Sequence, residues 1–262
     1  MAQRTDFKMK YVYGPVKSWR LGNSLGVDLL SQKQKQCSFN CSYCQVGPTP
    51  FYVLERKVFV PTEDVVKEVL SVKNRDIDYI TFSGNGEPTL ALNLGETIKK
   101  IKQKRKEKVA VLTNSSLLFR KDVREELSYA DMVQCKLDAA TDRTFAIIST
   151  QSKAITYNSI IAGLKLFRQE YKGELCLQIM FLQSNINEAE QFVLLAKEIN
   201  PDLIELNTPL RKSQEKPITP KQMEEIKKLF YEFNVRCVYD KHRDPSVPID
   251  KKTTEKRRGK EL

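Results

Sequence analysis

The stretch VAVLTNSSLLFRKDVREELSYADMVQCKL, residues 109–137, contains the pattern that decides the expected fold. It begins with an apolar, β-branched run at Val109–Leu112 and ends with another at Met132–Leu137, and both are typical of buried strands. Between them, Lys121–Leu127 has the spacing of apolar residues that an amphipathic helix requires. A strand, a helix and a second strand in this order predict a right-handed βαβ unit with two parallel strands.

The same alternation continues through most of the chain. The remaining expected strands are Leu25–Leu30, Ile77–Phe82, Leu175–Phe181, Leu203–Leu206 and Val235–Tyr239, and the remaining expected helices are Thr62–Val72, Leu94–Lys104, Ile155–Arg168, Glu188–Ile199 and Pro220–Phe233. So many units predict an α/β fold, a partial (β/α)6-type parallel barrel, over residues 21–242. Residues 1–20 are expected to form an N-terminal arm. The basic residues 243–262, whose last dozen have no apolar stripe, are expected to form a flexible tail.

The composition limits the chemistry that the chain can perform. It has 262 residues, of which 40% are hydrophobic, a net charge of +11, six cysteines and one histidine. No apolar run reaches the roughly 20 residues that span a bilayer, and the first residues lack the apolar core of a signal peptide. We therefore expect a cytoplasmic protein with no membrane partner. A single histidine argues against sites built from several imidazole ligands, so the cysteines are the first candidates for chemistry.

Cys37, Cys41 and Cys44 form a C-x3-C-x2-C cluster shortly after the first expected strand. In a cytoplasmic chain such clustering favours a metal over disulfides, and soft thiolates select zinc or an iron–sulfur cluster. Structural zinc takes four ligands, and the fourth would have to be His242 or a distant cysteine. An iron–sulfur cluster held by three cysteines leaves one iron without a protein ligand.

A second motif, Ser83-Gly84-Asn85-Gly86-Glu87, follows the strand expected at Ile77–Phe82. Glycines allow the backbone to approach a ligand closely, and a carboxylate pairs with a cation. The alternative is a plain Gly-Asn-Gly turn. The position of Ser83–Glu87 after a strand, about 40 residues beyond the cysteines, favours a functional interpretation of the motif.

The cysteine spacing, Tyr43 before the last cysteine and the glycine motif together resemble the radical S-adenosylmethionine (SAM) superfamily. The resemblance implies that the three cysteines hold a [4Fe–4S] cluster whose open iron binds the amino and carboxylate groups of SAM. Reductive cleavage of SAM then gives a 5′-deoxyadenosyl radical, which abstracts hydrogen from a substrate. It also implies that Ser83–Glu87 receives the methionine ammonium, although here Asn85 separates the two glycines.

Polar residues at the ends of later strands complete the expected site, because the carboxyl ends of barrel strands form the active face. By the same resemblance, Asn114 and Lys136 are the candidates for binding the ribose hydroxyls and the methionine carboxylate of SAM. Gln178 is expected to point inward from the next strand. The alternatives are that Asn114 only makes a turn and that Lys136 extends to the rim.

The segment Tyr13–Asp28 and the later run Glu205–Pro209 resemble a narrower group within the superfamily, over about residues 11–240. Its members are described as Fe–S oxidoreductases and are loosely related to the synthase of the tricyclic wyosine base of tRNA. Within the first segment, Trp19 and Arg20 are candidates for a stacking lid or an anion clamp. The alternative is an arm that packs across the end of the barrel.

The other three cysteines, Cys135, Cys176 and Cys237, stand singly along expected strands. Free cysteine is among the most buried residue types and usually packs as a small apolar side chain. We therefore expect core positions for all three and predict no second cluster.

Positive charge is concentrated in the helix that begins at Leu94 and in the last dozen residues. Such stripes bind phosphate backbones with strong dependence on salt, which leaves tRNA open as a partner or substrate. The alternative is a solvated helix face.

The sequence thus predicts a radical SAM enzyme that abstracts hydrogen from an unidentified substrate and receives electrons from a donor such as a flavodoxin or ferredoxin. Three alternatives remain at this point: a tRNA-modifying radical SAM enzyme, a glycyl-radical activating enzyme, and a zinc-stabilised nucleic-acid-binding module. The last would need neither the glycine motif nor a barrel. The sequence does not identify the catalytic residues, the fate of SAM or the oligomeric state.

Overall fold

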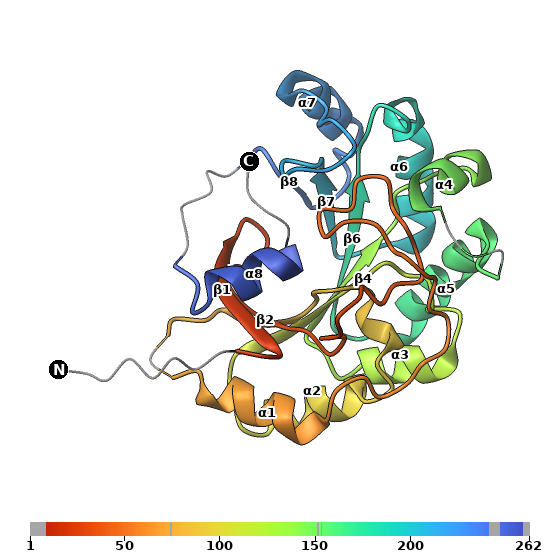
Figure 1. The fold of residues 1–262 in the computed structure, drawn as a ribbon. Helices are drawn as coiled ribbons and strands as arrows, with labels where there is room; N and C mark the ends of the chain where they lie inside the picture. Colours follow the sequence, from red (N-terminus) through yellow and green to blue (C-terminus); the bar gives the residue numbers. More distant parts are fainter. Residues whose placement is uncertain (1–8, 74, 151, 153, 241–246, 259–262) are drawn as a thin grey trace.

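The curled sheet in Figure 1 organises the molecule, a computed structural model that describes residues 9–73, 75–150, 152, 154–240 and 247–258. In these residues the sheet has eight strands in sequence order. They are β1 (Val12–Ser18), β2 (Gly22–Val27), β3 (Tyr79–Phe82), β4 (Lys108–Thr113), β5 (Met132–Lys136), β6 (Glu174–Met180), β7 (Leu203–Asn207) and β8 (Val235–Cys237). Strands β2 to β8 pair in parallel, which confirms the predicted partial barrel, and β1 pairs antiparallel to β2.

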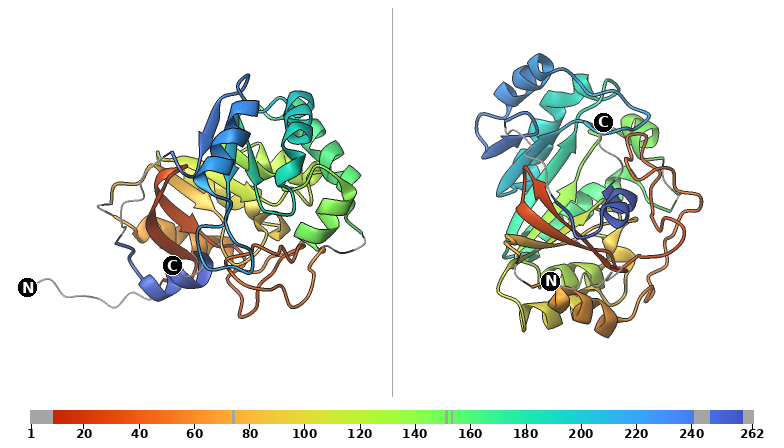
Figure 2. Two further views of the ribbon diagram at one scale, coloured as in Figure 1. Left: turned by 90° about the horizontal axis from the view of Figure 1, so that it is seen from above. Right: turned by 60° about the vertical axis from the view of Figure 1, so that its left-hand side comes forward.

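Helices connect the parallel strands and pack beside one another along the sheet (Figures 1 and 2). They are α1 (Thr62–Ser71), α2 (Leu94–Lys102), α3 (Lys121–Leu127), α4 (Asp142–Ser149), α5 (Tyr157–Glu170), α6 (Ala189–Ile199) and α7 (Pro220–Leu229), with short 3-10 turns η1 (Pro88–Leu90) and η2 (Ile186–Glu188). A further helix, α8 (Lys251–Arg258), follows the last strand and contacts β1. Every helix and strand expected from the sequence is present. None of the described helices is long and apolar enough to cross a membrane.

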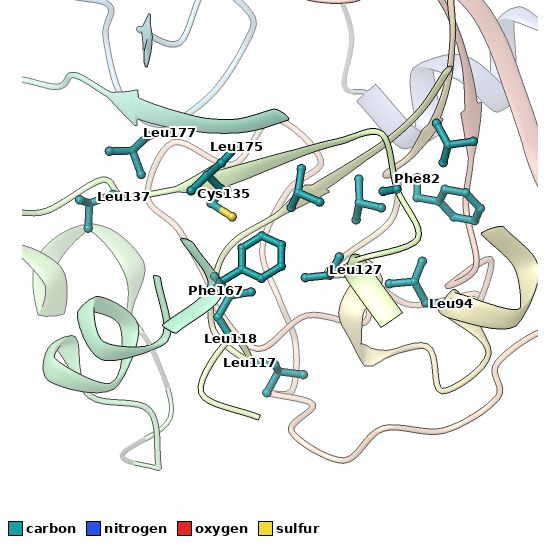
Figure 3. Packing of buried hydrophobic residues seen from close by; sticks show 14 of the residues in the cluster. Phe82, Leu94, Leu117, Leu118, Leu127, Cys135, Leu137, Phe167, Leu175 and Leu177 are labelled. Carbon is teal, nitrogen blue, oxygen red and sulfur yellow. The ribbon is translucent and has the colours of Figure 1, made fainter. Parts of the chain in front are cut away.

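The main core lies between the sheet and these helices. Leu175 and Leu177 of β6 and Cys135 of β5 are fully buried there, together with Leu127 of α3 and Phe167 of α5 (Figure 3). Strand residues alternate between faces, so the neighbours of these side chains point to the inner face of the curled sheet. Burial of each large apolar side chain contributes about 1.5–3 kcal/mol, so this face fixes the register of the strands.

The three isolated cysteines are core residues, as expected. Cys135 and Cys237 belong to the core between sheet and helices, and Cys176 belongs to a smaller apolar cluster on the inner face with Ala110 and Met132. Their side chains are almost completely buried.

The expected N-terminal arm is part of the sheet. Residues 12–18 form β1, so the boundary expected at residue 20 does not separate an arm from the barrel; residues 1–8 lie outside the described part of the chain. The sequence pattern does not predict this strand, because Gly14 and Pro15 are unusual within a strand. The pairing with β2 shifts register between Tyr13 and Val16, and an edge strand tolerates a proline at such an irregularity.

The expectation of a flexible tail is wrong for residues 251–258, which form helix α8 beside β1 (Figure 2). Helix α8 has no apolar stripe, and tertiary contacts of individual side chains stabilise it instead. Arg257 is buried and pairs with Asp28 of the loop after β2 at 2.8 Å, and the Thr254 hydroxyl accepts a hydrogen bond from the Gly14 N–H at 3.1 Å. Residues 243–246 and 259–262 of the expected tail lie outside the described residues.

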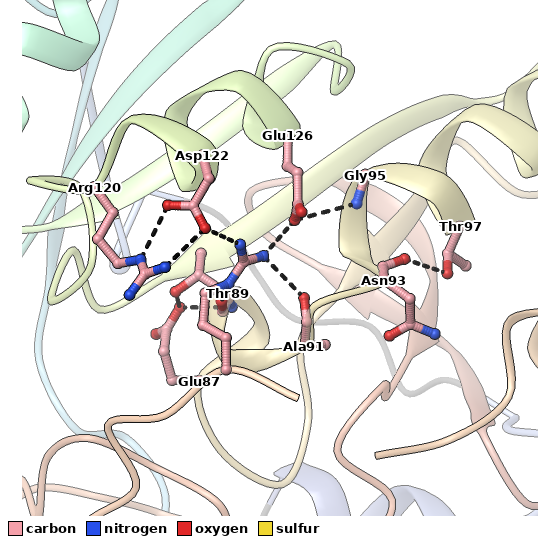
Figure 4. Close-up of polar contacts among 10 residues, drawn as sticks. Glu87, Thr89, Ala91, Asn93, Gly95, Thr97, Arg120, Asp122 and Glu126 are labelled. Atoms are coloured by element: carbon pink, nitrogen blue, oxygen red, sulfur yellow. Dashed lines mark hydrogen bonds and ion pairs between the residues drawn. The ribbon is translucent and has the colours of Figure 1, made fainter. Parts of the chain in front are cut away.

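Arg56 ties the loop that follows the clustered cysteines to helix α3, in the network drawn in Figure 4. Its buried guanidinium donates to the Thr89 carbonyl at 2.8 Å and to the Ala91 carbonyl at 3.1 Å. It also forms ion pairs with Asp122, at 2.7 Å, and with Glu126. One side chain therefore joins the cysteine-bearing loop, the turn η1 and α3.

Replacing Arg56 should destabilise the fold markedly. In Arg56→Met, Asp122, Glu126 and the carbonyls of Thr89 and Ala91 all lose the guanidinium as a donor, so we expect the free energy of unfolding to fall by about 3–5 kcal/mol in urea denaturation. The matched control is Lys100→Met, which breaks exposed ion pairs to Glu63 and Glu96 and should cost about 1 kcal/mol or less. Equal losses in the two variants would contradict the anchoring role of Arg56.

Candidate functional site

The three clustered cysteines lie on one loop between β2 and α1, and backbone hydrogen bonds fix its shape. The Cys44 N–H donates to the Cys41 carbonyl at 3.0 Å, which closes a turn between two of the cysteines. The Asn40 N–H donates to the Ser149 carbonyl at 3.0 Å, so the loop is docked on the end of α4. The chain therefore positions its three thiols by hydrogen bonds of the backbone.

Burial is the largest influence on the pKa of Cys37 and of Cys41. It raises the pKa of Cys37 to about 11, and together with the neighbouring thiols it raises the pKa of Cys41 to about 12. The Lys35 ammonium lowers the pKa of Cys37 and so opposes the effect of burial. It donates hydrogen bonds to the Cys44 sulfur at 2.9 Å and to the Gly47 carbonyl at 2.8 Å.

The donor set fits an iron–sulfur cluster. Three thiols share one loop, and two N–H donors reach them: Lys35 contacts Cys44, and the Asn114 amide points at the Cys37 sulfur at 3.7 Å. Hydrogen bonds to sulfur are among the features that set the potential of such clusters. Among the described residues, no three His, Cys, Asp or Glu side chains converge as one metal ion would require, whereas each thiolate of an iron–sulfur cluster binds its own iron. His242, the fourth ligand considered for zinc, lies outside the described residues.

The glycines of the motif were expected to let the backbone approach a ligand closely. In the structure they let it approach another segment of the same chain. Gly86 has φ +144°, and a Cβ there would lie 1.6 Å from the Gln36 carbonyl oxygen. The Gln36 N–H donates to the Asn85 carbonyl, and the Glu87 N–H donates back to the Gln36 carbonyl, both at 3.0 Å. At Gly84, with φ +141°, a Cβ would lie 2.6 Å from the carboxyl carbon of Asp28. The motif is thus joined directly to the residue that precedes the first clustered cysteine.

Glu87 braces the ends of two strands. Its carboxylate is 2% exposed and accepts hydrogen bonds from the Thr89 N–H and hydroxyl, from the Thr113 hydroxyl at 2.7 Å and from the Asn114 N–H at 2.6 Å. Burial raises the pKa of Glu87, and these four donors oppose the rise. A methionine ammonium would have to share or displace these contacts, so the geometry favours a structural role for this side chain.

A cavity of about 270 Å³ lies between the cysteine loop and the ends of the strands. The predicted site residues that line it are Tyr43, Cys44, Ser83, Gly84 and Gly86. Asn114 and Lys136 instead line a smaller neighbouring pocket, which shares the Tyr43 side chain with the first. Asn85 and Glu87, the other two residues of the glycine motif, are buried and line neither the cavity nor this pocket. The structure therefore gathers the expected residues on two sides of Tyr43.

Lys136 does not extend to the rim; its ammonium is part of a polar group around Tyr43. The ammonium lies 3.3 Å from an Asp138 carboxylate oxygen and 4.4 Å from the centre of the Tyr43 ring. The Tyr43 hydroxyl donates to the same Asp138 carboxylate. Burial, followed by the Asp138 charge, raises the pKa of Tyr43.

Two contacts at the site were not predicted from the sequence. Lys35 lies in an ordinary polar stretch with no spacing that distinguishes it, and Asp138 directly follows an expected strand without belonging to a motif. Lys35 and Asp138 contribute to the site only because the fold brings them next to the Cys44 thiol and the Tyr43 hydroxyl. For Asp138, the signal was its place one residue beyond the predicted strand Met132–Leu137.

The basic stripe that led us to consider tRNA lies on α2, whose lysines do not line the cavity. Much of its charge is already paired within the protein. Lys100 contacts Glu63 and Glu96, and Lys102 contacts Asp131. These contacts favour the alternative of a solvated helix face.

The sequence pattern of the Radical SAM superfamily matches residues 32–196, more than half of the chain. The chain belongs to the radical SAM superfamily. This confirms the resemblance, and members of this superfamily are enzymes that use SAM and an iron–sulfur cluster. The matched range includes the cysteine loop, the glycine motif and the polar group around Tyr43.

Other proteins are similar to this chain in sequence or in fold. A UPF0026 protein of Synechocystis sp. is 42% identical over 201 residues, 76% of each chain. A UPF0026 protein of Methanocaldococcus jannaschii is 39% identical over 233 residues, which cover 86% of this chain and 72% of the other. A structure of TYW1 with a lysine–pyruvate adduct bound shares the fold of this radical SAM chain, with a TM-score of 0.65, 19% identity, and coverage of 87% of this chain and 80% of that one.

Gly86→Ala should destabilise the chain much more than Gly47→Ala. Both glycines have positive φ, but a Cβ at Gly47 meets nothing within 4 Å, whereas one at Gly86 collides with the Gln36 carbonyl. We expect urea denaturation to show a loss of about 1–2 kcal/mol for Gly47→Ala and about 3 kcal/mol or more for Gly86→Ala. Similar losses would show that the Gly86 contact is not needed for the fold.

Proposed function

We propose that Cys37, Cys41 and Cys44 bind a [4Fe–4S] cluster, and that the enzyme cleaves SAM reductively and abstracts a hydrogen atom from a substrate. The observation that carries the proposal is the direct pairing of the cysteine loop with the glycine motif. Gln36 exchanges two backbone hydrogen bonds with Asn85 and Glu87, and both segments line the same cavity. A cluster on the first segment would therefore lie beside a ligand held by the second.

The residues of the chain would bind and orient the reactants. When bound, the cluster supplies the electron that breaks a carbon–sulfur bond of SAM. Lys35 and Asn114 would place N–H donors against the thiolates of Cys44 and Cys37. Tyr43 separates the cavity from the neighbouring pocket of Asn114 and Lys136, so SAM would contact both sides of its ring.

The electron would come from a donor such as a flavodoxin or ferredoxin. Cys41 and Cys44 are half-buried and border a surface hollow of about 410 Å³. Lys212 lies on the same hollow and adds a positive charge there. A cluster close to this surface supports electron delivery from a small acidic protein.

Removal of any one clustered cysteine should abolish the cluster. After anaerobic reconstitution, the unaltered chain should be brown, contain about four irons, and release 5′-deoxyadenosine when given reductant and SAM. Cys37→Ala, Cys41→Ala and Cys44→Ala should each lose the iron and the product, as measured by iron analysis, absorbance and chromatography.

Cys176→Ala is the matched control, because this cysteine is buried in the inner apolar cluster. It should keep the full iron content. Loss of iron from this variant would refute the ligand assignment, and a colourless chain with one bound zinc would refute the proposed function.

A further inference from the structure

The inner face of the curled sheet carries a polar floor, which we define as Arg20, Gln134, Gln178 and Glu205. Gln134 and Gln178 point the same way, because Gln134 pairs in register with Cys176 and Gln178 follows two residues later on β6. Glu205 of β7 is the register partner of Gln178. Arg20, on the turn between β1 and β2, donates to the Gln134 side-chain oxygen at 2.9 Å. The proposed SAM chemistry does not use these groups.

The side-chain amide nitrogen of Gln178 is an unpaired donor on the polar floor. Its side-chain oxygen accepts from the Lys136 ammonium at 3.4 Å, and an ammonium can only donate, which fixes the orientation of the amide. The amide nitrogen therefore points elsewhere. Gln178 is 2% exposed and lines the cavity, and its nitrogen has no hydrogen-bond partner among the described residues.

Arg20 brings a second unpaired donor to the same cavity. Its Nε is buried and has no partner in the described part of the chain, while one terminal nitrogen is held by Gln134. The guanidinium also lies 5.5 Å from the centre of the Trp19 ring, which restricts its orientation. Buried donors are rarely left without a partner. Both carboxylate oxygens of Glu205, on the same floor, also have no hydrogen-bond partner among the described residues, but Glu205 accepts no hydrogen bond from either donor and does not line the cavity. The two donor side chains that do line the cavity therefore indicate an acceptor supplied by a ligand.

The charge of the cavity indicates that this acceptor is negative. The lining includes Arg20, Arg211, Arg257 and Arg258 and no acidic residue among those described. Arg257 is neutralised by Asp28, and Arg211 donates to the Gln45 side chain, so Arg20 is the one of these four cations that belongs to the polar floor with Gln178. Glu205 is completely buried and does not line the cavity; burial raises its pKa, and the nearby Arg20 opposes that rise.

We propose that Arg20 and Gln178 bind an anionic group, a carboxylate or a phosphate, of a small-molecule substrate. This inference rests on the proposed function and names the substrate class for the same cavity. The anionic group would occupy the polar floor, and the rest of the substrate would extend toward Cys44 and the glycine motif, which line the same cavity. Charge-assisted hydrogen bonds from a guanidinium and an amide give such a site both affinity and orientation.

The test exploits the fact that Trp19 is the sole tryptophan of the sequence. The full, reconstituted chain is titrated with inorganic phosphate and separately with malonate, with chloride keeping the ionic strength constant. We expect a saturable change in Trp19 fluorescence with at least one anion, and heat in calorimetry of the same titration. Calorimetry also reports binding to which the indole does not respond.

Arg20→Lys and Gln178→Leu should each weaken this binding about tenfold or more. Arg20→Lys keeps the charge but lacks the Nε–H donor, so it separates hydrogen bonding from general attraction of anions. The matched control is Arg143→Gln, because Arg143 is an exposed residue of α4 that lines neither the cavity, nor the neighbouring pocket, nor the surface hollow. The affinity of this variant for the anions should not change.

Binding of phosphate alone would identify a phosphate-bearing substrate, and binding of malonate alone a carboxylate. No saturable binding of either anion, or equal binding by the unaltered chain and both floor variants, would overturn the inference. Release of 5′-deoxyadenosine by the unaltered chain is measured in parallel. If that product forms without anion binding, the substrate class is wrong and the proposed function stands; if anions bind and no product forms, the proposed function fails.

Discussion

The two backbone hydrogen bonds that Gln36 exchanges with Asn85 and Glu87 are the contact on which the site depends. They leave no room for a side chain at Gly86, because the Gln36 carbonyl oxygen occupies the place where its Cβ would be. The loop that carries the cysteines is therefore positioned by the end of β3. Since β3 is fixed by the core beneath it, the packing of sheet and helices determines where the thiols lie.

A second set of contacts extends from the same place. Asp28 lies against Gly84, accepts the Leu30 N–H at 3.0 Å and pairs with Arg257 of α8, so one carboxylate joins the glycine motif, the cysteine-bearing loop and the last described helix. Breaking a buried pair of this kind costs several kcal/mol, because the remaining charge has no partner. The wall of the cavity near α8 thus depends on the same segment as the cysteine loop.

The sequence predicted the parts of this structure that depend on local pattern. The parallel strands follow from β-branched runs such as Val109–Leu112, and the cysteine and glycine motifs follow from spacing. Strand β1 and helix α8 were missed because pairing with β2 and the buried Arg257 ion pair stabilise them, and neither leaves a periodic signal. The bracing contacts of Glu87 with β4 could not be predicted either, since the Thr113 hydroxyl and the Asn114 N–H reach its carboxylate only through the pairing of β3 with β4.

The half-barrel is open, so in the described part of the chain β1 and β8 each pair with one strand only, and an unprotected edge invites the strands of another molecule to pair with it. At one edge, β1 carries Pro15, which cannot donate a ladder hydrogen bond, and the register shift near it breaks the row of regularly spaced backbone groups. At the other edge, β8 is three residues long. Both features discourage edge-to-edge aggregation, so the barrel can stay open for a substrate without becoming a template for fibres.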